Sequence, residues 1–221
     1  LMDYAKSFVS TVKIGVVSTL LQIVSCSLVG YGLSRFSFFG KKTILVLVIF
    51  TIIVPPQAII IPLYLKYRNF TFFGIGNILG LLRGQPLSVN ILNTLWAFYV
   101  PALLGMGIRS GLFIFIFTQF FRGMPRDLED AAYIDGCGAM ITFLRIIVPN
   151  TGVGFLTVFL FSNVWYWNDY FYSSIFYNKV APLSVKLVGL RQEINTQLFN
   201  RWSNPFAAIT RVQAGSLLTI L

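Results

Sequence analysis

Carboxylate side chains gather in one short stretch of this sequence. Four of the seven acidic residues lie within nine positions: Asp127, Glu129, Asp130 and Asp135. A carboxylate at the centre of a lipid bilayer costs about 2.5–3.5 kcal/mol, and the sequence on both sides of this stretch is strongly apolar. The acidic stretch is therefore expected to lie outside a membrane, where it can meet another molecule.

Residues that usually carry catalysis are missing or scattered. The sequence has no His, and its two cysteines, Cys26 and Cys137, lie far apart without a CxxC spacing, which argues against metal or triad chemistry. No GxxxxGK[ST] motif occurs, since 40–42 (GKK) lacks both the upstream glycine and the Ser/Thr. We expect no catalytic residue, no metal site, no cofactor and no ATP-binding P-loop in this chain.

The composition is typical of an integral membrane protein. Hydrophobic residues make up 56% of the 221 positions, charged residues only 11%, and the mean hydropathy is +0.76, whereas soluble domains carry about 25% charged residues. The net charge of +10 comes from basic residues spread singly along the chain, a pattern that suits span ends and anionic lipid. We expect an all-α polytopic helix bundle in contact with the lipid bilayer, and no nucleic-acid partner.

Apolar runs long enough to cross a hydrocarbon core of about 30 Å indicate the helices that must position the acidic stretch. We expect crossings at 8–33, 43–65, 108–121 and 152–175, and a partial one from 206 onward. We expect 94–104 to be an interfacial or re-entrant piece, and the glycine-rich segment 66–93 to be an extramembrane connection. The whole chain, 1–221, is expected to be one transmembrane domain, truncated at both ends because it starts without Met and stops inside an apolar run.

Three features of these spans could concern either structure or a solute pathway. Pro55 and Pro56, followed by Gln57, forbid an unbroken helix, so they predict a kink or a break. Arg109 suits an interface anchor better than a substrate ligand. The aromatic cluster at 165–172 fits an interfacial belt or helix packing, and also the stacking of sugars. We interpret Asn168 and Asp169 as pathway candidates, and Gln57 as a weaker one.

The acidic stretch itself predicts a helix-turn-helix elbow over 125–149. Pro125 suits the first turn of a helix running to Asp135, with the acids near the positive end of the helix dipole. Gly136 and Gly138 supply freedom for a sharp turn, and helical spacing resumes at 141–148 before Pro149.

The spacing of this elbow resembles a known motif. Asp130-Ala131-Ala132, then Gly136 after three residues, then the run 146–149 (IIVP) is similar to the EAA loop in permease subunits of bacterial ABC importers. Asp130 stands where Glu is usual, and Val148 where Leu is usual. In that family the loop is a cytoplasmic coupling helix that docks on a separate ATPase subunit. The resemblance implies a set of coupling residues: Glu129, Asp130, Ala131, Ala132, Asp135, Gly136, Gly138 and Pro149.

Further runs narrow the resemblance to the second permease subunit of maltose-type sugar importers. They are YGLSRFSFFGKK at 31–42, PPQ at 55–57 with IPLY at 61–64, QFFRGMP at 119–125 and WND at 167–169. Such permeases usually have six helices, of which about five would be present. The resemblance implies a multi-pass, non-enzymatic subunit in the bacterial plasma membrane. Its implied partners are an ATPase dimer, a second permease subunit and an extracytoplasmic substrate-binding protein.

An ion-coupled secondary transporter or channel is the alternative. It would predict carboxylates within spans or a repeated pair of broken helices, and the apolar runs offer only Asp169 near a span end and one double proline. The dense basic turn at 35–42 favours a cytoplasmic location, whereas the longer opposite loops carry more basic residues in total, so charge alone does not fix the orientation. The cytoplasmic loop implied by the resemblance supports the same side as the basic turn.

Overall fold

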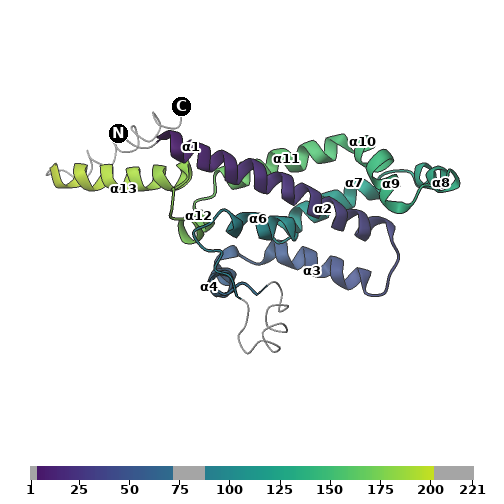
Figure 1. Cartoon of the computed structure of the whole chain (residues 1–221), viewed down its shortest axis with the longest axis horizontal. Helices are drawn as coiled ribbons and strands as arrows, with labels where there is room; N and C mark the ends of the chain where they lie inside the picture. The colour runs from purple at the N-terminus through teal and green to yellow at the C-terminus, as the bar shows by residue number, and fades with distance from the viewer. Residues whose placement is uncertain (1–3, 72–87, 202–221) are drawn as a thin grey trace.

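The computed structural model describes residues 4–71 and 88–201, and within these ranges the regular elements are helices. In chain order they are α1 (Tyr4–Val12), α2 (Ser18–Arg35), α3 (Lys41–Ile53), α4 (Pro56–Arg68), α6 (Trp96–Leu103), α7 (Ser110–Arg122), α8 (Asp127–Ile134), α9 (Ala139–Thr142), α10 (Val148–Asn150), α11 (Gly152–Trp167), α12 (Phe171–Phe176) and α13 (Leu183–Arg201). One isolated bridge joins Phe70 to Val89. The expected all-α fold class is confirmed (Figure 1). The expected partial span from 206 lies outside the described residues.

The first expected span is present as one long helix. A π-helical segment at Lys13–Val17 joins α1 to α2, so that the helix runs over Tyr4–Arg35 without a break. Its Ser, Thr and Gln side chains are buried, including Gln22 at 0% exposure, and a Cβ placed on Gly30 would lie 2.7 Å from the Cβ of Phe117 on α7. Small residues therefore let α2 and α7 pack closely, as in other membrane helix pairs.

The double proline breaks the second expected span. Val54 and Pro55 have extended backbone between α3 and α4, and the two helices meet at 103°. Since α3 has 13 residues, it is about 20 Å long, and α4 turns away from its direction. The prediction of a break is confirmed, and the crossing of 43–65 as one bent span stays a prediction.

The region 94–121 divides into two pieces, as expected, and both contain a helix. The short helix α6 packs against α2, and α7 follows after a turn at Gly105–Arg109. The second helix starts at Ser110 rather than at 108, because Arg109 adopts a left-handed conformation with φ of 58°.

The last described apolar run ends earlier than expected. Helix α11 stops at Trp167, and α12 is a separate short helix, so one unbroken helix over 152–175 is not present. By length and composition, within the described residues, one helix can cross a membrane, or up to three if each bent pair counts as one span. The pairs are Lys41–Ile53 with Pro56–Arg68, and Ala139–Asn150 with Gly152–Trp167. The expected number of crossings stays a prediction.

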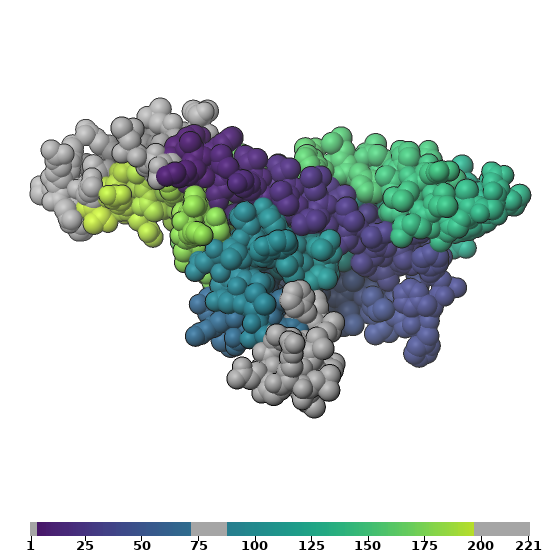
Figure 2. All heavy atoms as spheres, in the orientation of Figure 1, coloured from purple at the N-terminus to yellow at the C-terminus, as the bar shows by residue number. Residues whose placement is uncertain are grey.

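Two clusters of buried side chains hold these helices together. One contains Tyr31, Phe113, Phe117, Phe121 and Phe143 and joins α2 and α7 to the region after α8. The other contains Tyr67, Phe98, Tyr166 and Phe176 and joins α4, α6, α11 and α12. Helix α8 lies at one end of the long axis (Figure 1), and the space-filling view shows this region as a projecting tip (Figure 2). The fold thus presents the acidic stretch at an outer end.

Candidate functional site

The acidic stretch forms a short helix, with Asp127, Glu129 and Asp130 in its first turn and Asp135 as its C-cap residue. Helix α8 begins at Asp127, and the carbonyl of Arg126 accepts the first bonds, from the N–H groups of Glu129 at 2.8 Å and Asp130 at 3.0 Å. Pro125 therefore lies just before the helix rather than in its first turn, contrary to the sequence prediction. The acids at this end interact favourably with the helix dipole, as expected.

A glycine in the left-handed region ends α8 and makes the turn. Gly136 has φ of 80°. Its N–H donates to the carbonyl of Tyr133 at 3.1 Å, and the N–H of Cys137 donates to the carbonyl of Ala132 at 2.9 Å. These two bonds form a Schellman motif. Gly138 has φ of −76° and ψ of 162°, so it does not use the conformational freedom that the sequence suggested for it.

Helix α8 has two different faces. Glu129 and Ala132 are buried against the bundle. The opposite face is exposed and mixes apolar with acidic side chains, namely Asp127, Leu128, Asp130, Ala131, Tyr133, Ile134 and Asp135. Its large apolar side chains are Leu128, Tyr133 and Ile134, of which Ile134 is 86% exposed. The predicted coupling residues therefore divide into an inward pair and an outward face.

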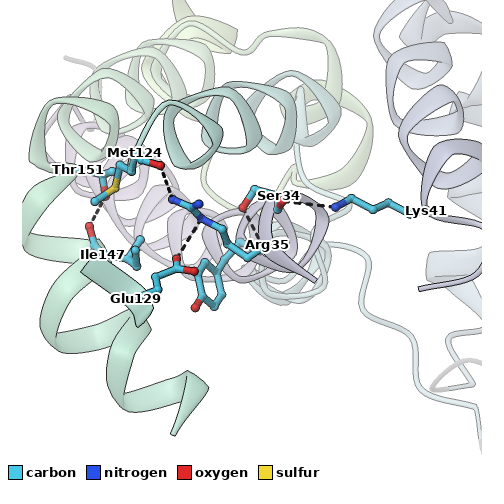
Figure 3. Close-up of polar contacts among 8 residues, drawn as sticks. Ser34, Arg35, Lys41, Met124, Glu129, Ile147 and Thr151 are labelled. Atoms are coloured by element: carbon cyan, nitrogen blue, oxygen red, sulfur yellow. Dashed lines mark hydrogen bonds and ion pairs between the residues drawn. The ribbon is translucent and has the colours of Figure 1, made fainter. Parts of the chain in front are cut away.

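A buried ion pair fastens α8 to the end of α2. The Nε atom of Arg35 lies 3.0 Å from Oε1 of Glu129, and the two side chains are 6% and 8% exposed. The Nη2 of Arg35 also donates to the carbonyl of Met124 at 2.9 Å (Figure 3). Arg35 is the last residue of α2. One guanidinium thus holds both α8 and the turn that precedes it.

The basic turn after α2 also stabilises the end of that helix. The ammonium group of Lys41 donates to the carbonyls of Ser34 at 3.3 Å and Phe36 at 2.8 Å, which satisfies acceptors at the end of α2. Sequence reasoning counted Arg35 and Lys41 only as orienting charges. The sequence feature that could have indicated the ion pair was an arginine at the end of a span together with an acid on the amphipathic helix of the elbow.

Burial dominates the electrostatics of Glu129. Burial raises the pKa of this carboxyl above its ordinary value. The guanidinium groups of Arg35 and Arg126 lower the pKa, but their effect is smaller than that of burial. The charged form of Glu129 therefore depends on its arginine partner.

The second limb of the elbow packs on the same core cluster. A helical run over Ala139–Asn150 contains a π-helical segment, Phe143–Ile147. The ring of Phe143 lies 4.9 Å from that of Tyr31, measured between centroids. Pro149 is exposed within α10, and the chain bends by 79° before α11. Both limbs of the elbow therefore contact α2 or its neighbours.

The three pathway candidates do not come together. Gln57 is exposed and is not among the described residues that line the cavity of about 360 Å³ between α4, α6 and α7. The side-chain amide of Asn168 donates to the carbonyl of Val164 in its own helix at 3.0 Å. Their pathway role stays a prediction without a shared site.

Asp169 caps α12. One carboxylate oxygen accepts from the N–H of Tyr172 at 3.2 Å, and the other accepts from the N–H and the hydroxyl of Ser173 at 2.8 and 2.9 Å. This capping explains why α12 starts anew after α11 instead of continuing it.

We expect Asp169→Ala to destabilise the protein by about 1 kcal/mol, the usual cost of losing a side-chain cap. Asp169→Asn keeps an acceptor oxygen and should lose less. The measurement is thermal unfolding of the purified complex in detergent, with transport assayed beside it. Lost transport in Asp169→Asn at unchanged stability would contradict the capping role and favour a pathway role.

Comparison with known proteins shows one family. Residues 25–220 match the family model described as a binding-protein-dependent transport system inner membrane component. Among curated proteins, the polygalacturonan/rhamnogalacturonan transport system permease protein YtcP of Bacillus subtilis (strain 168) is 28% identical over 187 residues, which are 85% of this chain and 56% of the relative. Protein LplC of the same organism is 30% identical over 189 residues, 86% of this chain and 55% of the relative.

A further relative and one solved structure agree with this match. The probable starch degradation products transport system permease protein AmyC of Thermoanaerobacterium thermosulfurigenes is 25% identical over 85% of this chain and 60% of the relative. The chain thus spans little more than half the length of these relatives. In fold it is similar to a chain of a bacterial ABC transporter involved in the import of the acidic polysaccharide alginate, with a TM-score of 0.64, 18% identity, and coverage of 98% of this chain and 64% of that one.

Proposed function

Since the chain belongs to the family of binding-protein-dependent transport system inner membrane components, we propose that it is the permease subunit of an ATP-driven carbohydrate importer. The names of YtcP and AmyC, which concern polygalacturonan/rhamnogalacturonan and starch degradation products, support a carbohydrate substrate. The chain would be a multi-pass, non-enzymatic subunit of a bacterial plasma membrane. Its partners would be a second permease subunit, an extracytoplasmic substrate-binding protein and an ATPase dimer.

The elbow of α8 to α10 is proposed as the docking element for the ATPase. The observation that carries this proposal is the buried pair of Arg35 and Glu129, because it makes α8 a projecting helix with a fixed base and a free outer face. On that outer face, Leu128, Ala131 and Ile134 offer apolar surface beside Asp130 and Asp135. A partner groove with apolar walls and basic rims would complement it.

The same contacts provide a route for motion into the membrane. Glu129 contacts the end of α2 through Arg35, and Phe143 contacts Tyr31 on α2 and Phe121 on α7. A displacement of the elbow by a moving ATPase would therefore shift the ends of two packed helices together. Such a shift can bias a two-state equilibrium between inward and outward conformations.

The structure gives no support to an ion-coupled secondary transporter. Within the described residues, Asp169 is the acid nearest to the end of an apolar helix, and its carboxylate is occupied by capping α12. A coupling carboxylate would need to exchange its partners for an ion.

Crosslinking tests the docking face with a matched pair of neighbours. In a Cys137→Ser background, Ala131→Cys is expected to crosslink efficiently to a cysteine in the groove of the co-expressed ATPase, because Ala131 is exposed. Ala132→Cys is the control, since Ala132 is 3% exposed and faces the bundle. The yield of crosslinked product is read on denaturing gels of the assembled full-length complex. Equal yields at the two positions, or a higher yield at 132, would refute the proposed face.

A further inference from the structure

A cavity of about 360 Å³ lies on the side of the molecule away from the elbow. It is formed where α4 bends away from α3 and meets α6 and the turn before α7. Aromatic side chains contribute much of its wall, among them Tyr67, Phe98, Tyr166 and Tyr172. Aromatic faces of this kind can stack on the apolar faces of sugar rings.

The described residues that line this cavity carry charges of one sign only. Among the described residues that line it, the charged ones are Lys66 and Arg109, and there is no carboxylate. The guanidinium of Arg109 lies over the ring of Trp165, 4.7 Å from its centroid, which holds its planar group in place. A planar, oriented guanidinium suits a carboxylate, which it can bind through two parallel hydrogen bonds.

The backbone of the turn that carries Arg109 has an uncommon conformation and is held by hydrogen bonds. Arg109 adopts φ of 58°, a conformation that residues other than glycine rarely adopt and that is common at functional sites. The preceding residue, Ile108, is held on both sides. Its N–H donates to the hydroxyl of Tyr166 at 3.3 Å, and its carbonyl accepts from the amide of Gln22 at 2.8 Å.

Gln22 belongs to a buried polar network that fixes this turn from α2 and α11. Its amide also donates to the hydroxyl of Ser110 at 2.8 Å, and its carbonyl oxygen accepts from the hydroxyl of Ser162 at 3.0 Å. Gly107 leaves no room for a side chain, since a Cβ there would lie 2.5 Å from the hydroxyl of Tyr166. The backbone at Arg109 is therefore positioned before any ligand arrives, which favours tight and selective binding.

The sequence alone favours an interface anchor at Arg109, but its place in the cavity wall and on the ring of Trp165 favours a ligand role. We propose that Arg109 and the aromatic wall of this cavity bind the carboxylate and the ring of an acidic saccharide. This inference rests on the proposed function, because it names the chemical class of sugar that this permease subunit recognises. Arg109 contacts the carboxylate, Lys66 adds positive potential at the cavity wall, and Tyr172 offers a half-buried ring for stacking.

The test compares one sugar backbone in charged and neutral form. The full-length importer is reconstituted in proteoliposomes with its own binding protein, and import of trigalacturonate is measured against import of its fully methyl-esterified form. Arg109→Gln is expected to lower the ratio of kcat/KM for the charged over the neutral trimer by about tenfold, as expected for losing one charge-assisted contact. Because all variants share one binding protein, a change in this ratio arises in the permease.

Two further variants make the result specific. Arg109→Lys keeps the charge but not the planar fork, so it should keep part of the ratio. Arg122→Gln removes a cation from the other end of α7 and should leave the ratio unchanged. An equal loss for both trimers in Arg109→Gln, with assembly intact, would show a merely structural arginine and overturn the proposal.

Other outcomes separate this proposal from the proposed function. Import of neutral oligosaccharides without any preference for the charged trimer would overturn the acidic-sugar site while leaving the importer assignment in place. Import of no carbohydrate at all would overturn both. A loss seen for both trimers only in vesicles containing phosphatidylglycerol would assign Arg109 to a lipid phosphate instead.

Discussion

Gly136→Pro is expected to reduce substrate-stimulated ATP hydrolysis of the assembled importer to its unstimulated rate, and to abolish transport. Gly136 needs φ of 80°, whereas proline fixes φ near −65° and has no N–H. The bond from the N–H of Gly136 to the carbonyl of Tyr133 would be lost, so the Schellman turn could not form. The two limbs of the elbow would then diverge, and α8 could not stay packed against the end of α2.

Alanine substitutions at the two glycines provide a graded control. Gly136→Ala should cost about 1–2 kcal/mol, since a left-handed conformation is unfavourable for residues with a Cβ, and should weaken coupling without abolishing it. Gly138→Ala should be silent, because its backbone is in the extended region and a Cβ there would meet nothing within 4 Å. Membrane insertion is checked for each variant by fractionation. Equal effects of the two alanine variants would contradict the turn assigned here.

Local sequence signals explain why the elbow could be predicted. The helix start, the glycine turn and the second limb depend on short-range preferences of acids, glycine and apolar residues within about one segment. The double-proline break has the same origin, because prolines remove donors at that point in the chain. For these features the sequence prediction and the structure differ by only a few residues.

Contacts between distant segments could not be predicted in this way. Arg35 and Glu129 are separated by 94 positions, and only packing of α8 against the end of α2 brings them within 3.0 Å. The angle of 103° between α3 and α4 depends on the packing of α4 near α6, not on the prolines alone. Nothing in the sequence indicated that Asp169, which we interpret as a pathway candidate, also accepts hydrogen bonds from the first turn of α12.

Breaking the ion pair of Arg35 and Glu129 is the second change for which we expect a large effect on coupling. Arg35→Gln is expected to leave Glu129 buried without a counter-charge, and breaking a buried pair in this way costs about 3–5 kcal/mol. The loss should appear locally, as release of α8 from the bundle. Hydrogen exchange of residues 127–134 should therefore rise by at least tenfold, and substrate-stimulated ATP hydrolysis should fall strongly while the helices stay inserted.

A double-mutant cycle separates the pair from general packing. Arg35→Met combined with Glu129→Leu removes both charges and keeps apolar volume, so it should be more stable than either single variant. Purely additive effects of the two substitutions would rule out a direct interaction.

The pH dependence of Arg35→Gln provides an independent check on the same pair. Without the arginine, the already raised pKa of Glu129 should rise further. A carboxyl whose pKa is higher in the folded than in the unfolded state contributes less to stability as pH rises from its unfolded toward its folded pKa. The defect should therefore be mildest at the acidic end of the pH range in which the complex stays assembled, and should grow as the pH is raised. A defect that does not change over this range would mean that Glu129 is not the unpaired charge, and that Arg35 acts through its bond to Met124 instead.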